Sequence, residues 1–203
     1  MNPGFLEFVP YVLQIMSQML ELHTGAIPSS YGVFLPLLLT PIPWQQKGSI
    51  PALVRLIRAY LSKDAPSIIR NGQLTSILAV IQQRLIPSKM NDVYGFELLQ
   101  AVVMDIPVGE LSKHFNVILL TLLNRLQSTS TDKYAAGFVQ FVCFIMAVQV
   151  KEMGPSFVVN AINAIQAGYV GTTSSRDITL IIFKSLDFDP RKCYISTGAK
   201  GPS

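Results

Sequence analysis

The feature that most constrains the fold is a helical spacing of apolar residues that recurs along nearly the whole chain. Between residues 110 and 127 the apolar positions repeat every three or four residues, at Phe115, Ile118, Leu119, Leu122, Leu123 and Leu126. This spacing gathers the side chains on one face of an α-helix. It returns in residues 50–61 and 74–85, and no segment alternates apolar and polar residues between hairpin turns. The sequence therefore predicts an all-α protein.

Loop and cap residues divide this pattern into pairs of helices. The expected helices are 3–23 with 29–39, 49–63 with 72–86, 92–105 with 109–127, and 132–150 with 155–167. A further helix is expected at 175–186, and residues 196–203 are expected to be a disordered tail. Ser49, Asp92 and Asp132 are expected to cap helices, because their side-chain oxygens can accept the unpaired amides of a first turn.

The four pairs span residues 3–39, 49–86, 92–127 and 132–167, so they follow one another about every forty residues. That period is typical of HEAT and armadillo repeats, whose helix pairs stack into an α-α superhelix, or solenoid. We therefore expect residues 1–203 to form a single solenoid of about four pairs and one additional helix. The alternative that spacing alone leaves open is a plain helical bundle.

The composition admits three classes of protein, because 50% of the residues are hydrophobic and only 14% are charged. These are a membrane protein, a helical fold rich in core residues, and a piece whose ends pack on other parts of a protein. A membrane span needs roughly 20 apolar residues in a row, and the best run, 138–150, is shorter and contains Gln140 and Gln149. The net charge of +4 is spread along the chain, so no basic cluster predicts nucleic-acid binding.

The sequence offers no catalytic, cofactor-binding or metal-binding set of residues. His23 and His114 are isolated, and Cys143 and Cys193 form neither a metal pair nor a disulfide framework. Residues 168–175 contain two glycines but lack the Gly-Lys-Ser/Thr ending of a phosphate-binding loop. We therefore predict that the protein is not an enzyme and acts by binding other proteins.

Two stretches resemble a known family in detail. Residues 27–61 read IPSSYGVFLPLLLTPIPWQQKGSIPALVRLIRAYL, and residues 89–107 read KMNDVYGFELLQAVVMDIP. Both are similar to the C-terminal HEAT region of the exportin-2 (CAS/CSE) family. The resemblance is carried by the long ungapped match through about residue 127 rather than by one motif.

The resemblance implies a part of a nuclear export receptor that carries importin-α from the nucleus to the cytoplasm in a RanGTP-dependent manner. It implies importin-α and RanGTP as partners of the full-length protein, leaves nucleoporins open as further partners, and implies shuttling between nucleus and cytoplasm. Family members are several times longer than this chain. The alternatives are another HEAT or armadillo scaffold or another karyopherin, and, in a different class, an enzyme or membrane protein with a helical body.

The expected binding surface is the polar side of the second helix in each pair, because a solenoid presents these helices as a ladder on one face. The candidate residues are Ser76, Gln83, Lys113, Asn124, Asn160 and Asn163. The alternative is that they are merely solvated, since polar helix faces are the rule. Between the first two pairs, Trp44 and Pro51 are expected to lie at the packed boundary.

Overall fold

The computed structural model describes residues 7–148 and 153–169, and every regular element in them is helical. The elements are α2 (Val9–Leu22), α3 (Ser29–Gly32), α4 (Phe34–Leu38), η1 (Pro43–Gln45), η2 (Lys47–Ser49), α5 (Ile50–Arg70), α6 (Gln73–Val80), η3 (Ile81–Leu85), α7 (Asp92–Asp105), α8 (Val108–Thr129), α9 (Asp132–Val148) and α10 (Pro155–Tyr169). The helix expected at 175–186 and the tail expected at 196–203 lie outside the described residues. That all 203 residues form one unit stays a prediction.

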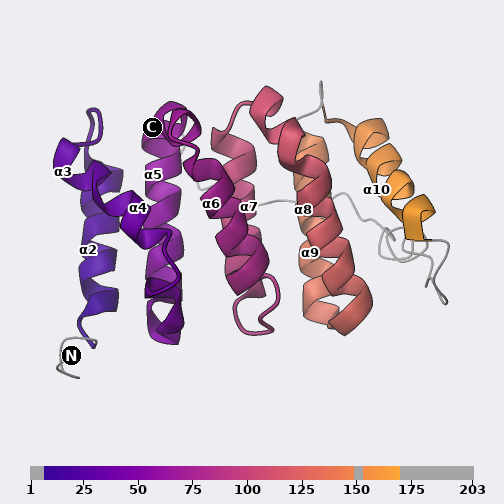
Figure 1. Ribbon diagram of the computed structural model, residues 1–203, viewed down its shortest axis with the longest axis horizontal. Coiled ribbons are helices and arrows are strands. Elements are labelled where there is room, and N and C mark those ends of the chain that lie inside the picture. Colours follow the sequence, from indigo (N-terminus) through magenta and orange to yellow (C-terminus); the bar gives the residue numbers. More distant parts are fainter. Residues whose placement is uncertain (1–6, 149–152, 170–203) are drawn as a thin grey trace, which may run out of the picture.

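The helices form two layers of a stack that runs along the long axis of the molecule (Figure 1). The first helices of the pairs make one row, in which α2 packs on α5, α5 on α7 and α7 on α9. The second helices are α3 with α4, α6 with η3, α8 and α10. In the part of the chain that the structure describes, no helix is both long and apolar enough to cross a bilayer. The predicted all-α solenoid of stacked pairs is confirmed.

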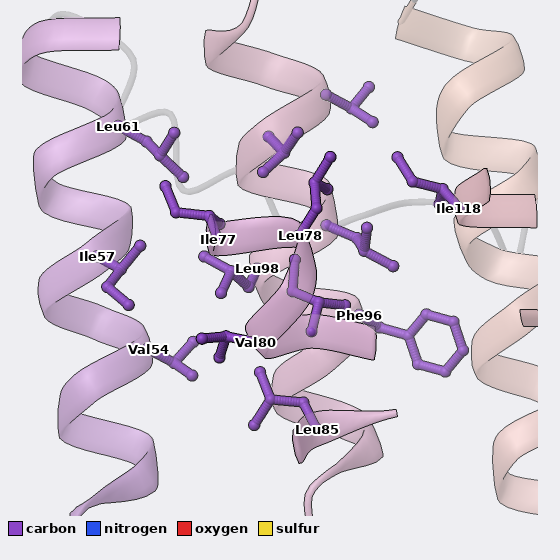
Figure 2. Packing of buried hydrophobic residues seen from close by; sticks show 14 of the residues in the cluster. Val54, Ile57, Leu61, Ile77, Leu78, Val80, Leu85, Phe96, Leu98 and Ile118 are labelled. Atoms are coloured by element: carbon purple, nitrogen blue, oxygen red, sulfur yellow. The ribbon is translucent and has the colours of Figure 1, made fainter. Parts of the chain in front are cut away.

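The core is continuous between neighbouring pairs, because each helix buries the stripe that its sequence spacing predicts (Figure 2). Val54, Ile57 and Leu61 of α5 lie against Ile77 of α6. All four of these side chains are at most 1% exposed. Since a single pair has too little partner surface to cover such stripes, the fold depends on stacking.

The second helix of the first pair, expected as one helix over residues 29–39, is broken into α3 and α4. The cause is Pro36, which has no amide proton to donate to the carbonyl oxygen of Gly32 and whose ring would clash with that carbonyl. The break falls at Val33, between these two residues. The loop residue Trp44 is anchored to the end of α4. Its side chain is 5% exposed, and its Nε1 donates a hydrogen bond of 2.8 Å to the Leu38 carbonyl oxygen.

Helix α5 continues beyond the end expected at residue 63, after an interruption at Asp64, whose backbone is non-helical (φ −149°, ψ 52°). Asp64 caps the turn that follows, because its Oδ1 accepts a hydrogen bond of 3.2 Å from the amide of Ser67. Pro66 fits this first turn, where its missing amide proton would have no helical partner. The sequence thus predicts the break, but the extra turn to Arg70 was missed.

Four of the expected local details, the caps at Ser49, Asp92 and Asp132 and the packing of Pro51, differ from the structure. Ser49 occupies the N-cap position of α5 without a capping hydrogen bond from its side chain, and Asp92 lies inside α7, where it contacts a cation instead. The cap of α9 is Thr131, whose Oγ1 accepts a hydrogen bond of 3.2 Å from the amide of Tyr134. Pro51 is exposed, so its expected packing at the first boundary is wrong, whereas that of Trp44 is confirmed.

Gly137 of α9 allows close packing against α7, and we expect Gly137→Ala to lower the free energy of unfolding by about 1–3 kcal/mol. A Cβ atom there would lie 2.9 Å from the ring of Phe96, which is itself held between Tyr134 and Phe141. The matched control is Gly109→Ala in α8, where nothing lies within 4 Å of the new atom. Urea unfolding should show Gly109→Ala at or above the stability of the parent, and equal effects of the two variants would contradict this packing.

Candidate partner-binding surface

The structure places all six predicted binding residues at exposed positions on second helices. Ser76 belongs to α6, Gln83 to η3, Lys113 and Asn124 to α8, and Asn160 and Asn163 to α10. We refer to these six residues as the second-helix row. Lys113 also pairs with Glu110 of the same helix at 2.7 Å, so its charge is partly compensated within α8. Whether the row contacts a partner stays a prediction.

Two members of the row, Ser76 and Gln83, line the same small hollow between the first and second pairs. It has a volume of about 140 Å³, and its other walls include Trp44, Leu39 and Arg84. The hollow is too small for more than one or two side chains of a partner. It brings a hydroxyl, an amide and a cation together beside an aromatic ring.

Asn124 lines a larger groove of about 660 Å³ between η3 and α8. The groove is bridged by Gln82, whose Nε2 donates a hydrogen bond of 3.0 Å to Thr121 Oγ1. Apart from Arg125, its remaining polar walls are Gln127, Ser128 and Thr129, which carry no charge. On one side runs the π-helical turn of η3, in which the amide of Ile86 bonds to the carbonyl of Ile81 at 2.9 Å. Uncharged donors and acceptors of this kind suit a polar contact with another protein rather than an ionic one.

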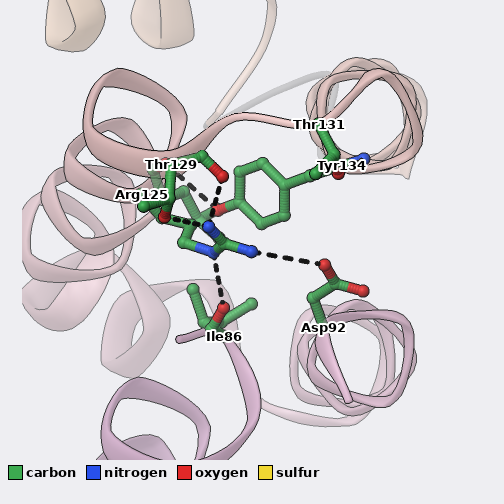
Figure 3. A network of polar contacts seen from close by, with 7 residues as sticks. Ile86, Asp92, Arg125, Thr129, Thr131 and Tyr134 are labelled. Carbon is green, nitrogen blue, oxygen red and sulfur yellow. Dashed lines mark hydrogen bonds and ion pairs between the residues drawn. The ribbon is translucent and has the colours of Figure 1, made fainter. Parts of the chain in front are cut away.

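The floor of that groove conceals a buried cation, Arg125, which is 6% exposed (Figure 3). Its Nε donates a hydrogen bond of 3.1 Å to the Ile86 carbonyl oxygen, and its Nη1 donates to the carbonyl oxygen and Oγ1 of Thr129. Its Nη2 lies 3.8 Å from Oδ2 of Asp92, which is 2% exposed, and the guanidinium lies 5.1 Å from the centre of the Tyr134 ring. Arg125 thus ties α7, α8 and α9 together.

Sequence reasoning missed this network, although one signal pointed to it. Arg125 falls within the apolar stripe of its helix, one turn after Leu122 and next to Leu126. Arginine is almost never fully buried unless it is paired. A charge within an apolar stripe therefore predicts a buried partner, but the partner itself lies 33 residues earlier in the sequence.

A second groove, of about 560 Å³, lies on the first helices and was not predicted; we refer to it as the first-helix groove. Its floor contains the small residues Ala59 and Ala101, and ion pairs between neighbouring helices cross its edges. Arg55 of α5 donates two hydrogen bonds, of 2.9 and 2.7 Å, to the carboxylate of Glu21 in α2. These hydrogen bonds hold the pKa of Glu21 below its ordinary value. Nη1 of Arg58 in α5 lies 3.6 Å from Oε2 of Glu97 in α7.

Asp105, at the end of α7, is the one acid of this groove whose pKa is raised, because burial disfavours its charged form more than Arg58 favours it. A carboxyl with a raised folded-state pKa costs stability at neutral pH, and the cost is relieved as the pH falls. We expect Asp105→Asn to stabilise the chain at pH 7 by up to about 1 kcal/mol, since the end of a helix also disfavours an anion. Urea unfolding from pH 7 to pH 4 should show this gain shrinking, and a loss of stability at pH 7 would contradict it.

In residues 7–148 and 153–169, no three His, Cys, Asp or Glu side chains come together as a metal centre would need. Nε2 of His23 donates a hydrogen bond of 3.0 Å to the Ala26 carbonyl oxygen in its own loop. Both grooves lie between helix pairs, so their shape depends on how the pairs are stacked.

The family model described as "CAS/CSE protein, C-terminus" matches residues 1–184. Exportin-2 of Danio rerio is 44% identical over 138 residues, and exportin-2 of Homo sapiens is 40% identical over 138 residues. These regions cover 67% of this chain and 14% of each relative, so the chain spans about one seventh of the length of the curated relatives it matches.

A solved structure shows the same arrangement of helices. It is described as "The exportin Cse1 in its cargo-free, cytoplasmic state", and it matches with a TM-score of 0.66 and 32% sequence identity. The match covers 81% of this chain and 17% of that one. The sequence, the family model and the stack of helices therefore agree that this chain belongs to the CAS/CSE family, whose matched relatives are exportins.

Proposed function

We propose that this chain acts as the C-terminal HEAT region of a nuclear export receptor that carries importin-α from the nucleus to the cytoplasm together with RanGTP. The observation that carries the proposal is the match of residues 1–184 to the C-terminal model of the CAS/CSE family. The similarity to exportin-2 of fish and human, and to the cargo-free exportin Cse1, supports it. The protein would shuttle between nucleus and cytoplasm and act by binding, without catalysis.

The stacked fold suggests how binding of one partner could affect binding of the other. Neighbouring pairs touch through apolar stripes and through single ion pairs such as Arg55–Glu21, so small changes at each junction add up to a change in curvature. If importin-α and RanGTP prefer the same curvature, each strengthens the binding of the other by the same factor. In this proposal the second-helix row lines the surface on which a partner lies, and its amides supply neutral hydrogen bonds.

A pull-down tests the proposal. The bait is immobilised importin-α, and the prey is zebrafish exportin-2 whose C-terminal region is replaced by residues 1–184 of this chain. We expect retention with RanGTP and none with RanGDP, while the 203-residue chain alone is retained weakly or not at all. Retention that is equal with both forms of Ran would favour a general HEAT scaffold.

The same assay tests the second-helix row. Asn124→Asp with Asn160→Asp adds two charges at exposed positions, so it should change retention without unfolding the chain. The matched control is Gln45→Glu with Gln14→Glu, which adds two charges at exposed positions outside the row and outside the groove lined by Asn124. Equal retention of both double variants would remove the row from the proposed contact. Nucleoporins are proposed as a further class of partner, and retention on nucleoporin repeats would support them.

A further inference from the structure

The first-helix groove lies on the opposite layer of the stack from the second-helix row. Its lining residues come from four successive first helices, α2, α5, α7 and α9 (Figure 1). Its volume of about 560 Å³ falls within the range of roughly 300–1,000 Å³ that is usual for ligand pockets. Because the groove crosses neighbouring helices instead of following one of them, its shape suits an extended segment of chain.

The charges of the groove decide which class of ligand it favours. Five charged side chains line it, and they are Glu21, Arg55, Arg58, Glu97 and Asp105. Two guanidinium groups stand against three carboxylates, so the groove carries a net charge of −1, whereas the whole chain carries +4. An excess of carboxylates repels the phosphates of nucleic acids and of anionic lipids. The groove therefore favours a cationic ligand.

Asp105 is the carboxylate of the groove that is left for such a ligand. Arg55 is already hydrogen-bonded to Glu21, and Arg58 is paired with Glu97. Among the described residues no cation lies within 4 Å of the Asp105 carboxylate, and Arg58 attracts it only from farther away. Burial raises the pKa of Asp105, so its charge is costly in the free chain, and a cation from another molecule would reduce that cost.

An apolar wall accompanies this carboxylate. Ala101 and Met104 of α7 and Phe144 of α9 line the same groove, and Met104, next to Asp105 in the chain, is 60% exposed. Lysine and arginine lay their apolar stems along such surfaces while the charged end reaches a polar group. A metal ion would use the carboxylate alone, and no metal-binding cluster occurs within the described parts of the chain. The combination therefore suits a long cationic side chain.

We propose that the first-helix groove binds a basic segment of a partner protein, with a lysine or arginine side chain paired to Asp105 and its stem against Met104 and Phe144. This interaction goes beyond the proposed carriage of importin-α and does not depend on it. The groove belongs to the first helices and the second-helix row to the other layer, so the two surfaces can be occupied at the same time.

A peptide array tests the proposal with the full 203-residue chain. Each heptapeptide has a fixed central residue, Arg, Lys, Gln or Glu, and random residues elsewhere, and the retained amount of fluorescently labelled chain is measured at pH 7. Asp105→Asn removes the unpaired charge and keeps the shape of the side chain. The matched control is Asp132→Asn, at an exposed acid outside the groove. Unspecific attraction to a chain of net charge +4 would favour the Glu peptides instead.

We expect the Arg and Lys peptides to retain about five times as much chain as the Gln peptides, the gain of one ion pair at a partly exposed site. Asp105→Asn should abolish this preference, and Asp132→Asn should leave it unchanged. Equal retention on all four sets, or strongest retention on the Glu peptides, would overturn the proposal. A preference for Arg and Lys that survives Asp105→Asn would also overturn it, because the site would then lie elsewhere.

Two further variants complete the test. Met104→Ser, at an exposed position where it should not disturb folding, removes the contact with the stem and should lower retention on the Arg and Lys peptides. If circular dichroism shows that Asp105→Asn is unfolded, Met104→Ser decides, and unchanged retention would contradict the proposal. Arg191→Gln with Lys192→Gln should change nothing. A large rise in retention with this double variant would show that the chain's own C-terminal residues occupy the groove, and the proposed partner segment would be wrong.

Discussion

Arg125→Met is expected to lower the free energy of unfolding by about 3–5 kcal/mol, because it leaves the carboxylate of Asp92 buried without its cation. The ordinary stability of a domain is about 5–15 kcal/mol, so the loss would be a large share of the total. The substitution also removes the donors to the carbonyl oxygens of Ile86 and Thr129. Methionine keeps much of the volume of the arginine stem, so the effect reports charge and hydrogen bonding more than packing.

The double variant Arg125→Met with Asp92→Ala separates the two causes. Removing both charges should restore at least half of the lost stability, since a buried ion pair can often be replaced by apolar groups at little cost. Arg84→Met, at an exposed arginine one repeat earlier, is the control and should change stability by no more than about 0.5 kcal/mol. Urea unfolding followed by circular dichroism measures all three. A loss below about 1 kcal/mol for Arg125→Met would show that the network does not hold α7, α8 and α9 together.

Trp44→Ala is expected to cost about 3 kcal/mol or more, because it empties the packed boundary between the first two pairs. The indole is 5% exposed, and its hydrogen bond to Leu38 is the link between the loop and α4. Trp44→Phe keeps an aromatic ring and removes the donor, so it should cost about 1 kcal/mol. Trp44 is the single tryptophan of the chain, so the emission spectrum of the parent reports this site alone. A spectrum typical of fully solvated tryptophan would contradict the burial.

Much of the fold could be predicted because helical spacing and cap residues are local signals. The bounds of α7 agree with those expected at 92–105, since Asn91 and Pro107 mark both ends in the sequence. The broken helix around Pro36 shows where local reasoning was incomplete. The proline was visible, but the short segment was read as one helix because its apolar residues continue through it. The extra turn after Asp64 was not predicted, because the helix expected at 49–63 ends where the backbone of Asp64 leaves the helical conformation and its side chain caps a new turn.

The candidate surface also contains features that the sequence predicts and features that it does not. The exposed positions on the second helices follow from the period of each helix taken alone, so their exposure could be predicted. The first-helix groove depends on which helices are neighbours, because Glu21, Arg55 and Glu97 come from three different pairs. The pairing of Asp92 with Arg125 likewise needs the folded chain. Contacts between residues that are far apart in sequence are set by stacking, which no local pattern encodes.

The most direct test of the proposed re-export function is the coupling between the two ligands of the full-length protein. Importin-α is titrated into zebrafish exportin-2 carrying residues 1–184 of this chain, at RanGTP concentrations from zero to saturation. We expect saturating RanGTP to lower the Kd of importin-α at least ten-fold, and saturating importin-α to lower the Kd of RanGTP by the same factor, as linkage requires. A Kd of importin-α that does not change with RanGTP would contradict the proposal.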